Sequence, residues 1–188
     1  GFPDALYHVR YEAPAAAALA DDLLRRMPAL ARDDERPWDH GVWVPLVHMY
    51  PQHDVPVLQM SLPTDDPVAL MDLGSRLRPL RDEGVLIVGS GFLTHGLPFL
   101  TEWRIDAAVP GWSSDFDAWA GEALARGDVD ALASYRTQAP GLPYAHPTVE
   151  HYTPLFVTLG AATDPEEPGL QVIDGFWMGL SKRSLQVA

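Results

Sequence analysis

The sequence contains no cysteine, few basic residues and no long hydrophobic run. The absence of cysteine excludes disulfides, cysteine-based zinc sites and thiol catalysis. Thirteen Lys and Arg stand against 26 Asp and Glu, which gives the 188 residues a net charge of −13. Nucleic acids and anionic membranes bind clustered positive charge, so we expect neither as a partner. The longest apolar stretch, around residues 84–93, is far too short to span a bilayer.

Three common functional motifs are also missing. The sequence has no P-loop and no GxGxxG after a strand, since Gly89-Ser90-Gly91 supplies only two of the glycines. Ser90 does not lie in a nucleophile elbow, because Phe92 stands where the second glycine of GxSxG is needed. A signal peptide is not visible either. Together with the absence of cysteine, this makes the cytoplasm the expected location.

The composition is that of a globular chain with many loops. Hydrophobic residues make up 47% and charged residues 21%, while 18 Pro and 15 Gly predict sharp ends to the elements. Apolar periodicity predicts helices over residues 14–31, 42–50 (short and buried), 67–82, 113–126, 128–135 and 148–160. Strands are expected over residues 55–62, 85–90, 171–173 and 184–187. We therefore expect an α/β fold: a single domain with a mixed, largely parallel central sheet flanked by helices.

Seven histidines are the main candidates for chemistry. Four of them lie in contexts that indicate structural or exposed positions: His8, His48, His53 and His146. His95 differs, because it follows the predicted strand 85–90 in a glycine-rich turn. Ligands of parallel α/β sheets bind beyond the carboxyl ends of the strands, and glycines there allow a ligand to approach closely. The position of His95 therefore favours a functional role, with capping of a carbonyl as the alternative.

Two further histidines have acidic neighbours. His40 follows Asp39, whose carboxylate either tunes the imidazole pKa or caps the following helix. His151 follows Glu150 near the start of the helix predicted over residues 148–160, with Thr148 as its N-cap. Adjacent helical residues point about 100° apart, so only one of Glu150 and His151 is expected to face a given site. HExxH is excluded because no second histidine follows at the required spacing.

An ordered set of segments resembles the class III extradiol ring-cleavage dioxygenases, and within them the DOPA 4,5-dioxygenase-like branch. These segments are GFPDALY at 1–7, WDHGVW at 38–43, MYPQHDVP at 49–56, DEGVLIVGSGFLTH at 82–95, PTVEHYTPL at 147–155 and MGLSKRSLQV at 178–187. The resemblance covers essentially the whole chain. It implies an enzyme that uses O₂ to open a catechol ring beside its two hydroxyls.

The resemblance also implies roles for individual residues. His151 matches a metal ligand, and His95 matches an active-site histidine with acid/base duty that is sometimes drawn as a further ligand. His40 matches a position in the pocket next to the substrate, and Glu150 is the alternative ligand if His151 turns away. Fe(II) is the metal expected for turnover, with Zn(II) possible in the same site. The expected partners are a small-molecule catechol and O₂.

One departure from the family sets a further expectation. The family's first two metal-binding histidines precede the segment matched by Gly1, so we expect residues 1–188 to form a single catalytic domain that lacks its N-terminal strands. If nothing precedes Gly1, at most two expected ligands remain, and metal binding should be weak and turnover absent. The alternatives are a zinc-dependent hydrolase, a non-catalytic binding protein or an inactive relative on the same scaffold.

Overall fold

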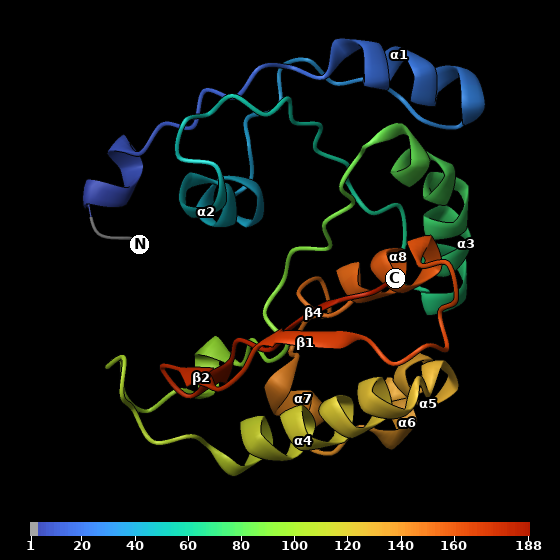
Figure 1. The fold of residues 1–188 in the computed structure, drawn as a ribbon. Helices are drawn as coiled ribbons and strands as arrows, with labels where there is room; N and C mark the ends of the chain where they lie inside the picture. The colour runs from blue at the N-terminus through green and yellow to red at the C-terminus, as the bar shows by residue number, and fades with distance from the viewer. Residues whose placement is uncertain (1–3) are drawn as a thin grey trace. The chain divides into compact units, whose positions relative to one another are not determined.

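The computed structural model describes residues 4–188 (Figure 1). The chain divides into two compact units, Gly1–Ser61 and Leu62–Ala188, each with its own helices. The three residues before Asp4, which begin the first family segment, lie outside the described part. Every helix within residues 4–188 falls short of the length and apolarity that a membrane crossing requires. The assignment of all 188 residues to one catalytic domain stays a prediction.

Residues 4–61 of the first unit form the helices η1 (Asp4–His8), α1 (Ala17–Arg26) and α2 (His40–Met49). Helix α1 is shorter than the predicted range 14–31. It ends before Met27, which lies outside the helical region (φ −132°, ψ 81°) because the following Pro28 disfavours helical backbone at the residue before it. Helix α2 confirms the predicted helix, but none of its residues is buried, so the prediction of a buried helix was wrong.

The strand predicted over residues 55–62 is reduced to a single bridge. Val57 pairs in parallel with Ala15, and the neighbouring bonds are Val57 N to Pro14 O at 3.0 Å and Ala16 N to Val57 O at 3.3 Å. Val55 and Leu58 on either side remain exposed. The β-branched composition of the segment therefore produces an extended backbone without a sheet around it in the described unit.

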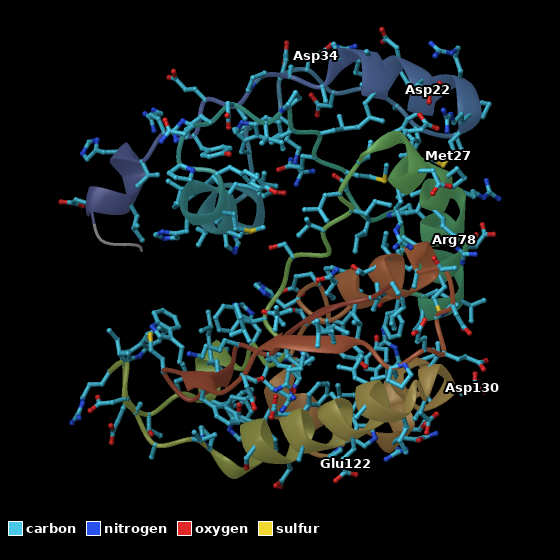
Figure 2. The ribbon with its side chains drawn as sticks, viewed as in Figure 1. Asp22, Met27, Asp34, Arg78, Glu122 and Asp130 are labelled. Carbon is cyan, nitrogen blue, oxygen red and sulfur yellow. The ribbon has the colours of Figure 1, made fainter. Side chains whose placement is uncertain are left out.

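Helices make up most of the regular secondary structure of the second unit. Its helices are α3 (Pro67–Leu77), η2 (Arg78–Glu83), η3 (Leu97–Phe99), α4 (Gly111–Arg126), α5 (Val129–Ala133), α6 (Tyr135–Gln138), α7 (Leu142–Ala145) and α8 (Pro154–Ala161). The predicted helices over 67–82 and 113–126 are confirmed, and Pro79 turns the end of the first into the 3₁₀ helix η2. Glu122 and Asp130 point outward from their helices (Figure 2), as an acidic solvated surface requires.

The strands of the second unit are short and antiparallel. β1 (Leu170–Ile173) pairs with β4 (Ser184–Gln186), and β2 (Phe176–Trp177) pairs with β3 (Leu180–Ser181). Fold class is thus mixed helix and sheet as expected, but within residues 4–188 the sheets are small and a largely parallel central sheet is not seen.

The predicted central strand over residues 85–90 belongs to neither sheet. Leu86 and Val88 within it are 65% and 54% exposed. Strand propensity measures how well side chains fit a half-buried pleated surface, and it does not by itself supply a neighbouring strand. The segment therefore stays extended in the described chain without being a sheet strand.

The core of the second unit is built around Tyr152. Its ring lies 4.8 Å from that of Tyr135, 5.4 Å from that of Phe116 and 5.3 Å from that of Phe156, and all four side chains are buried. The Tyr152 hydroxyl donates to the Leu132 carbonyl at 3.2 Å. Burial raises the pKa of Tyr152, so this hydroxyl keeps its proton. The ring cluster thus fixes the chain immediately after His151.

Helices α3 and α8 pack unusually closely because a glycine faces the partner backbone from each side. A Cβ on Gly74 would lie 2.2 Å from the Val157 carbonyl oxygen, and one on Gly160 would lie 2.2 Å from that of Met71. The Arg78 guanidinium (labelled in Figure 2) then donates to the Gly160 carbonyl at 2.9 Å. This bond satisfies a carbonyl near the C-terminus of α8. The crossing holds the end of the helix that follows the candidate site.

Replacing Gly74 with alanine should destabilise the protein, because the new methyl group would overlap backbone that cannot move aside. We expect a loss of about 1–3 kcal/mol in the free energy of unfolding, measured by urea denaturation. Gly111→Ala is the matched control, since a Cβ at Gly111 meets nothing within 4 Å. Equal stability of Gly74→Ala and Gly111→Ala would contradict the close helix crossing.

His146 is a buried structural histidine, as its sequence context predicts. It is 3% exposed, and its Nε2 lies 2.8 Å from the carbonyl oxygen of Leu93. A carbonyl only accepts, so Nε2 carries the proton, and the buried Nδ1 has no hydrogen-bond partner among residues 4–188. Burial lowers the pKa of His146 to about 4, although the bond to Leu93 acts in the opposite direction. The residue is therefore neutral when the protein is folded at neutral pH.

His146 should make stability fall in mild acid. Its unfolded pKa is about 6.5, so between pH 6.5 and 4 the unfolded chain takes up a proton that the folded chain does not. We expect this to remove about 2–3 kcal/mol of unfolding free energy between pH 7 and pH 4.5. Urea denaturation of the wild type and of His146→Gln at both pH values isolates the effect, because the carboxylates contribute to both proteins. The same acid-induced loss in the two proteins would contradict the assignment.

Candidate metal centre

The site begins where two distant segments touch through their backbones. A Cβ on Gly91 would lie 2.1 Å from the carbonyl oxygen of His151, so only glycine permits this approach. Next to it, the backbone N–H of Phe92 donates to Nδ1 of His151 at 3.2 Å, which orients the imidazole ring. The glycine-rich turn was expected to admit a ligand. In the structure, Gly91 admits the backbone of His151.

His95 is held over the ring of His151. Its backbone N–H donates to the Ala145 carbonyl at 2.7 Å, and the residues before it are anchored by the bond between Leu93 and His146. The His95 and His151 rings stack with centroids 3.5 Å apart and planes 16° apart. Two positive charges at this separation repel, so the stack favours at least one neutral imidazole, the form that binds metals.

Glu150 supplies a carboxylate beside the two rings. The Thr148 hydroxyl donates to its Oε1 at 2.8 Å. Partial burial on its own raises the pKa of Glu150, but the bond from Thr148, a backbone hydrogen bond and the nearby His151 and His95 lower it, and the net pKa is below its usual value. Glu150 is therefore ionised at neutral pH and available as an oxygen ligand.

Together these three side chains form a cluster with metal-binding composition. His95, Glu150 and His151 each offer one ligand atom, and these atoms all lie within 4.8 Å of one another. Two imidazoles and one carboxylate with open positions suit non-haem iron, and zinc binds the same donor types. The sequence predicted at most two ligands in this chain. The structure brings three donors together.

Residues 148–153 lie in bends and turns before helix α8, which begins only at Pro154. A continuous helix from Thr148 would need the residue at 154 to donate to the carbonyl of Glu150, and proline has no N–H to do so. A single helical turn is still closed there by the bond from the Thr153 N–H to the Val149 carbonyl at 3.0 Å. Only one of Glu150 and His151 was expected to face a given site, yet the structure brings ligand atoms of both within 4.8 Å of each other.

His40 lies in the first unit, Gly1–Ser61, and not in the unit that holds His95, Glu150 and His151. It is the first residue of α2 and is exposed. Asp39 occupies the N-cap position, but its side chain makes no cap bond and instead accepts from Arg36 Nη2 at 2.8 Å. The capping alternative is thus not observed, and the role of His40 beside a substrate stays a prediction.

Sequence reasoning missed a buried polar network next to His95. Thr94, Ser113, Asp117 and Ser181 are all buried and joined by hydrogen bonds, and Arg183 closes the network with an ion pair to Asp117. Its members come from three separate parts of the sequence and match no motif. The one available signal is local. Small polar residues lie among the apolar residues of α4 and next to the apolar residues of β3.

Comparison with known proteins shows what the chain is related to. Residues 2–172 match the family described as the catalytic LigB subunit of aromatic ring-opening dioxygenase. The 4,5-DOPA dioxygenase extradiol of Beta vulgaris is 41% identical over 188 residues, covering 95% of this chain and 68% of the relative. The protein of the same name from Escherichia coli K12 is 37% identical over 195 residues, covering all of this chain and 71% of the relative.

The fold has a solved counterpart. The crystal structure of an uncharacterized protein from Escherichia coli K12 superposes with a TM-score of 0.84 at 34% identity, covering 97% of this chain and 77% of the other. Sequence and structure comparisons therefore agree over nearly the whole chain, and both include the residues around His95 and His151. The chain belongs to the family of the catalytic LigB subunit of aromatic ring-opening dioxygenase, and its enzyme class is that of the extradiol ring-cleaving dioxygenases.

Proposed function

We propose that the protein opens the ring of a catechol beside its two hydroxyls with O₂, at a metal ion held by His95, Glu150 and His151. The observation that carries the proposal is the convergence of their three ligand atoms within 4.8 Å, in a chain of this family. Relatives named 4,5-DOPA dioxygenase extradiol support a catechol that bears a side chain. The substrate class and the metal are the parts proposed.

Iron is the proposed metal for turnover. Fe(II) held by His95, Glu150 and His151 would supply redox chemistry and open positions for a chelating catechol and O₂, whereas Zn(II) fits the same donors without redox chemistry. His95, Glu150 and His151 are half-buried or exposed, so a small aromatic molecule reaches them from solvent. The ionised Glu150 would offset the metal's positive charge, and the imidazoles of His95 and His151 would provide nitrogen ligands.

His95 has a second proposed role as the acid/base group. A catechol must lose protons to bind as a chelate, and a neutral imidazole accepts one efficiently near pH 7. Without substrate, His95 completes the donor set. When a catechol occupies its place, the imidazole is free to take the hydroxyl proton and later return it to the ring-opened product. The family resemblance supports a place for His40 beside the same substrate.

Single substitutions should separate metal binding from turnover. His151→Ala removes a ligand, and we expect the Fe(II) or Zn(II) dissociation constant to rise at least about 100-fold. His95→Ala also removes a donor and should raise the metal dissociation constant about 10- to 100-fold; at saturating metal it should still lower kcat by about 10²- to 10⁴-fold, because general acid–base catalysis is lost. Metal content after dialysis and steady-state rates measure the two effects. His53→Ala is the control, since the His53 ring packs against that of Tyr11 in the other unit. Full metal occupancy in His151→Ala would contradict the ligand assignment.

Oxygen uptake tests the reaction itself. We expect the protein reconstituted anaerobically with Fe(II) to consume one O₂ per catechol and to form a yellow ring-opened semialdehyde. Resorcinol is the matched control, because its hydroxyls are not adjacent and cannot chelate. The zinc-loaded protein should consume no O₂. If several substituted catechols cause no uptake at full iron occupancy, the proposed reaction is wrong, and ester or amide hydrolysis by the zinc form without oxygen would point to a hydrolase.

A further inference from the structure

The segment that carries His95 lacks the support of a sheet. Within the described chain, residues 93–95 belong to no strand and no helix. Thr94 is nevertheless fully buried, and its Oγ1 accepts from the Ser181 backbone N–H at 2.7 Å and hydrogen-bonds the Ser113 hydroxyl at 2.8 Å. Side-chain bonds thus replace the backbone ladder that usually fixes an extended segment. The residue they fix is the direct neighbour of His95.

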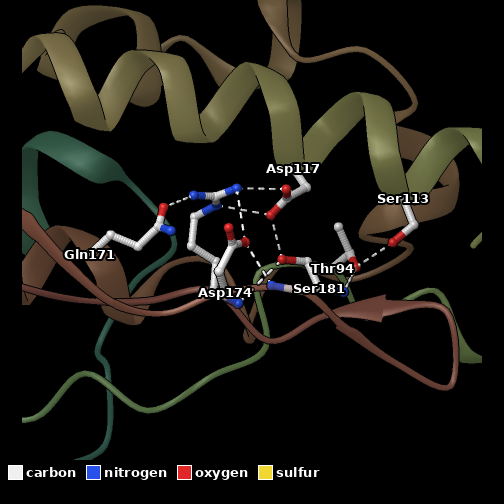
Figure 3. Close-up of polar contacts among 8 residues, drawn as sticks. Thr94, Ser113, Asp117, Gln171, Asp174 and Ser181 are labelled. Atoms are coloured by element: carbon white, nitrogen blue, oxygen red, sulfur yellow. Dashed lines mark hydrogen bonds and ion pairs between the residues drawn. The ribbon is translucent and has the colours of Figure 1, made fainter. Parts of the chain in front are cut away.

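Ser181 connects Thr94 to an ion pair. Its hydroxyl donates to Oδ1 of Asp117 at 2.5 Å and accepts from the Arg183 backbone N–H at 3.3 Å. Figure 3 shows Asp117 and Ser113 reaching from α4 toward Ser181 and Thr94. Because Ser181 bonds to Thr94 through its backbone and to Asp117 through its side chain, a shift of β3 moves both contacts together.

The ion pair forms the far end of the network. Arg183 Nε and Nη2 donate to the two oxygens of Asp117 at 2.9 and 2.8 Å, a bidentate geometry that fixes direction as well as distance. The two side chains are only 14% and 10% exposed. Arg183 also bonds Gln171 of β1 and lies 3.5 Å from Asp174. The guanidinium of Arg183, the residue just before β4, therefore joins α4 to β1 and to the turn that follows β1.

We propose that this network, from Arg183 through Asp117 and Ser181 to Thr94, is a positioning device that sets where the His95 imidazole stands relative to Glu150 and His151. Buried polar networks cost more than apolar packing unless every member is satisfied, and a satisfied one specifies a single geometry. Here the Arg183–Asp117 ion pair fixes one end of the network, and the other end fixes Thr94, the neighbour of His95. The inference rests on the proposed role of His95.

Thr94→Val is the sharpest test, because it keeps the shape of the side chain and removes the hydroxyl. We expect the Co(II) dissociation constant, used as a spectroscopic probe of the donor set, to rise about 10-fold or more, and the visible Co(II) bands to change. With Fe(II), kcat should fall about 10- to 100-fold while KM changes less than about 3-fold. Thr94→Ser restores the hydroxyl and should recover both values to within about 3-fold of wild type.

A control separates positioning from general destabilisation. Leu70 is fully buried in α3, and Leu70→Val provides a stability loss unconnected to the network. If Thr94→Val retains wild-type Co(II) affinity and kcat, or loses no more of them than Leu70→Val does, the network is structural support only and the proposal is overturned. Arg183→Lys adds a distal test, because a single ammonium cannot form the bidentate pair. It should shift the Co(II) bands in the same direction as Thr94→Val.

A metal-free measurement keeps this inference separate from the proposed function. In protein labelled with ¹⁵N-histidine, the NMR chemical shifts of the His95 ring nitrogens should change in Thr94→Val and in Arg183→Lys, while those of the His53 ring nitrogens should not. If the wild type binds no metal and consumes no O₂, the proposed function fails, yet the ring shifts still test the network. If metal binding is intact and the His95 ring is unmoved in both variants, the positioning role is wrong and the proposed function stands.

Discussion

The site depends on one steric constraint, the contact between the backbones of Gly91 and His151. A side chain at position 91 would place its Cβ 2.1 Å from the His151 carbonyl oxygen. With glycine, the segment before His95 lies directly against the turn that carries Glu150 and His151, and Phe92 N–H reaches the His151 ring. Residues some 60 positions apart in sequence are thereby brought to ligand distance.

The turn that bears His151 is held from behind by the aromatic core. Tyr152 points into that core, where its ring contacts Tyr135 and Phe116 and its hydroxyl bonds the Leu132 carbonyl. Consecutive residues thus have opposite environments: His151 remains accessible while Tyr152 is 1% exposed. A rigid anchor next to an accessible imidazole is what the proposed role of His151 as a metal ligand requires.

In the second unit, the sequence predicted the helices over 67–82 and 113–126 and the strands over 171–173 and 184–187, which are β1 and β4. The helices were recognised because amphipathic periodicity is a local property. The strand over 85–90 was not formed, because a strand also needs a partner that no local pattern supplies. At the candidate site, the structure brings together His95 and His151, which were selected from context and resemblance, and it adds Glu150. Their roles stay predictions, because the convergence of side chains from two distant segments depends on tertiary contacts that no local pattern contains.

The buried network was beyond sequence reasoning for a different reason. The residues of this network look like ordinary surface residues, because their types are usually exposed: Thr94, Ser113, Asp117, Ser181 and Arg183. Their withdrawal from solvent appears only when α4, β3 and residues 93–95 are assembled. Burying a charge pair where apolar side chains would pack as well costs stability, so its presence beside His95 needs a reason other than stability. Geometric control of the half-buried His95 imidazole is such a reason.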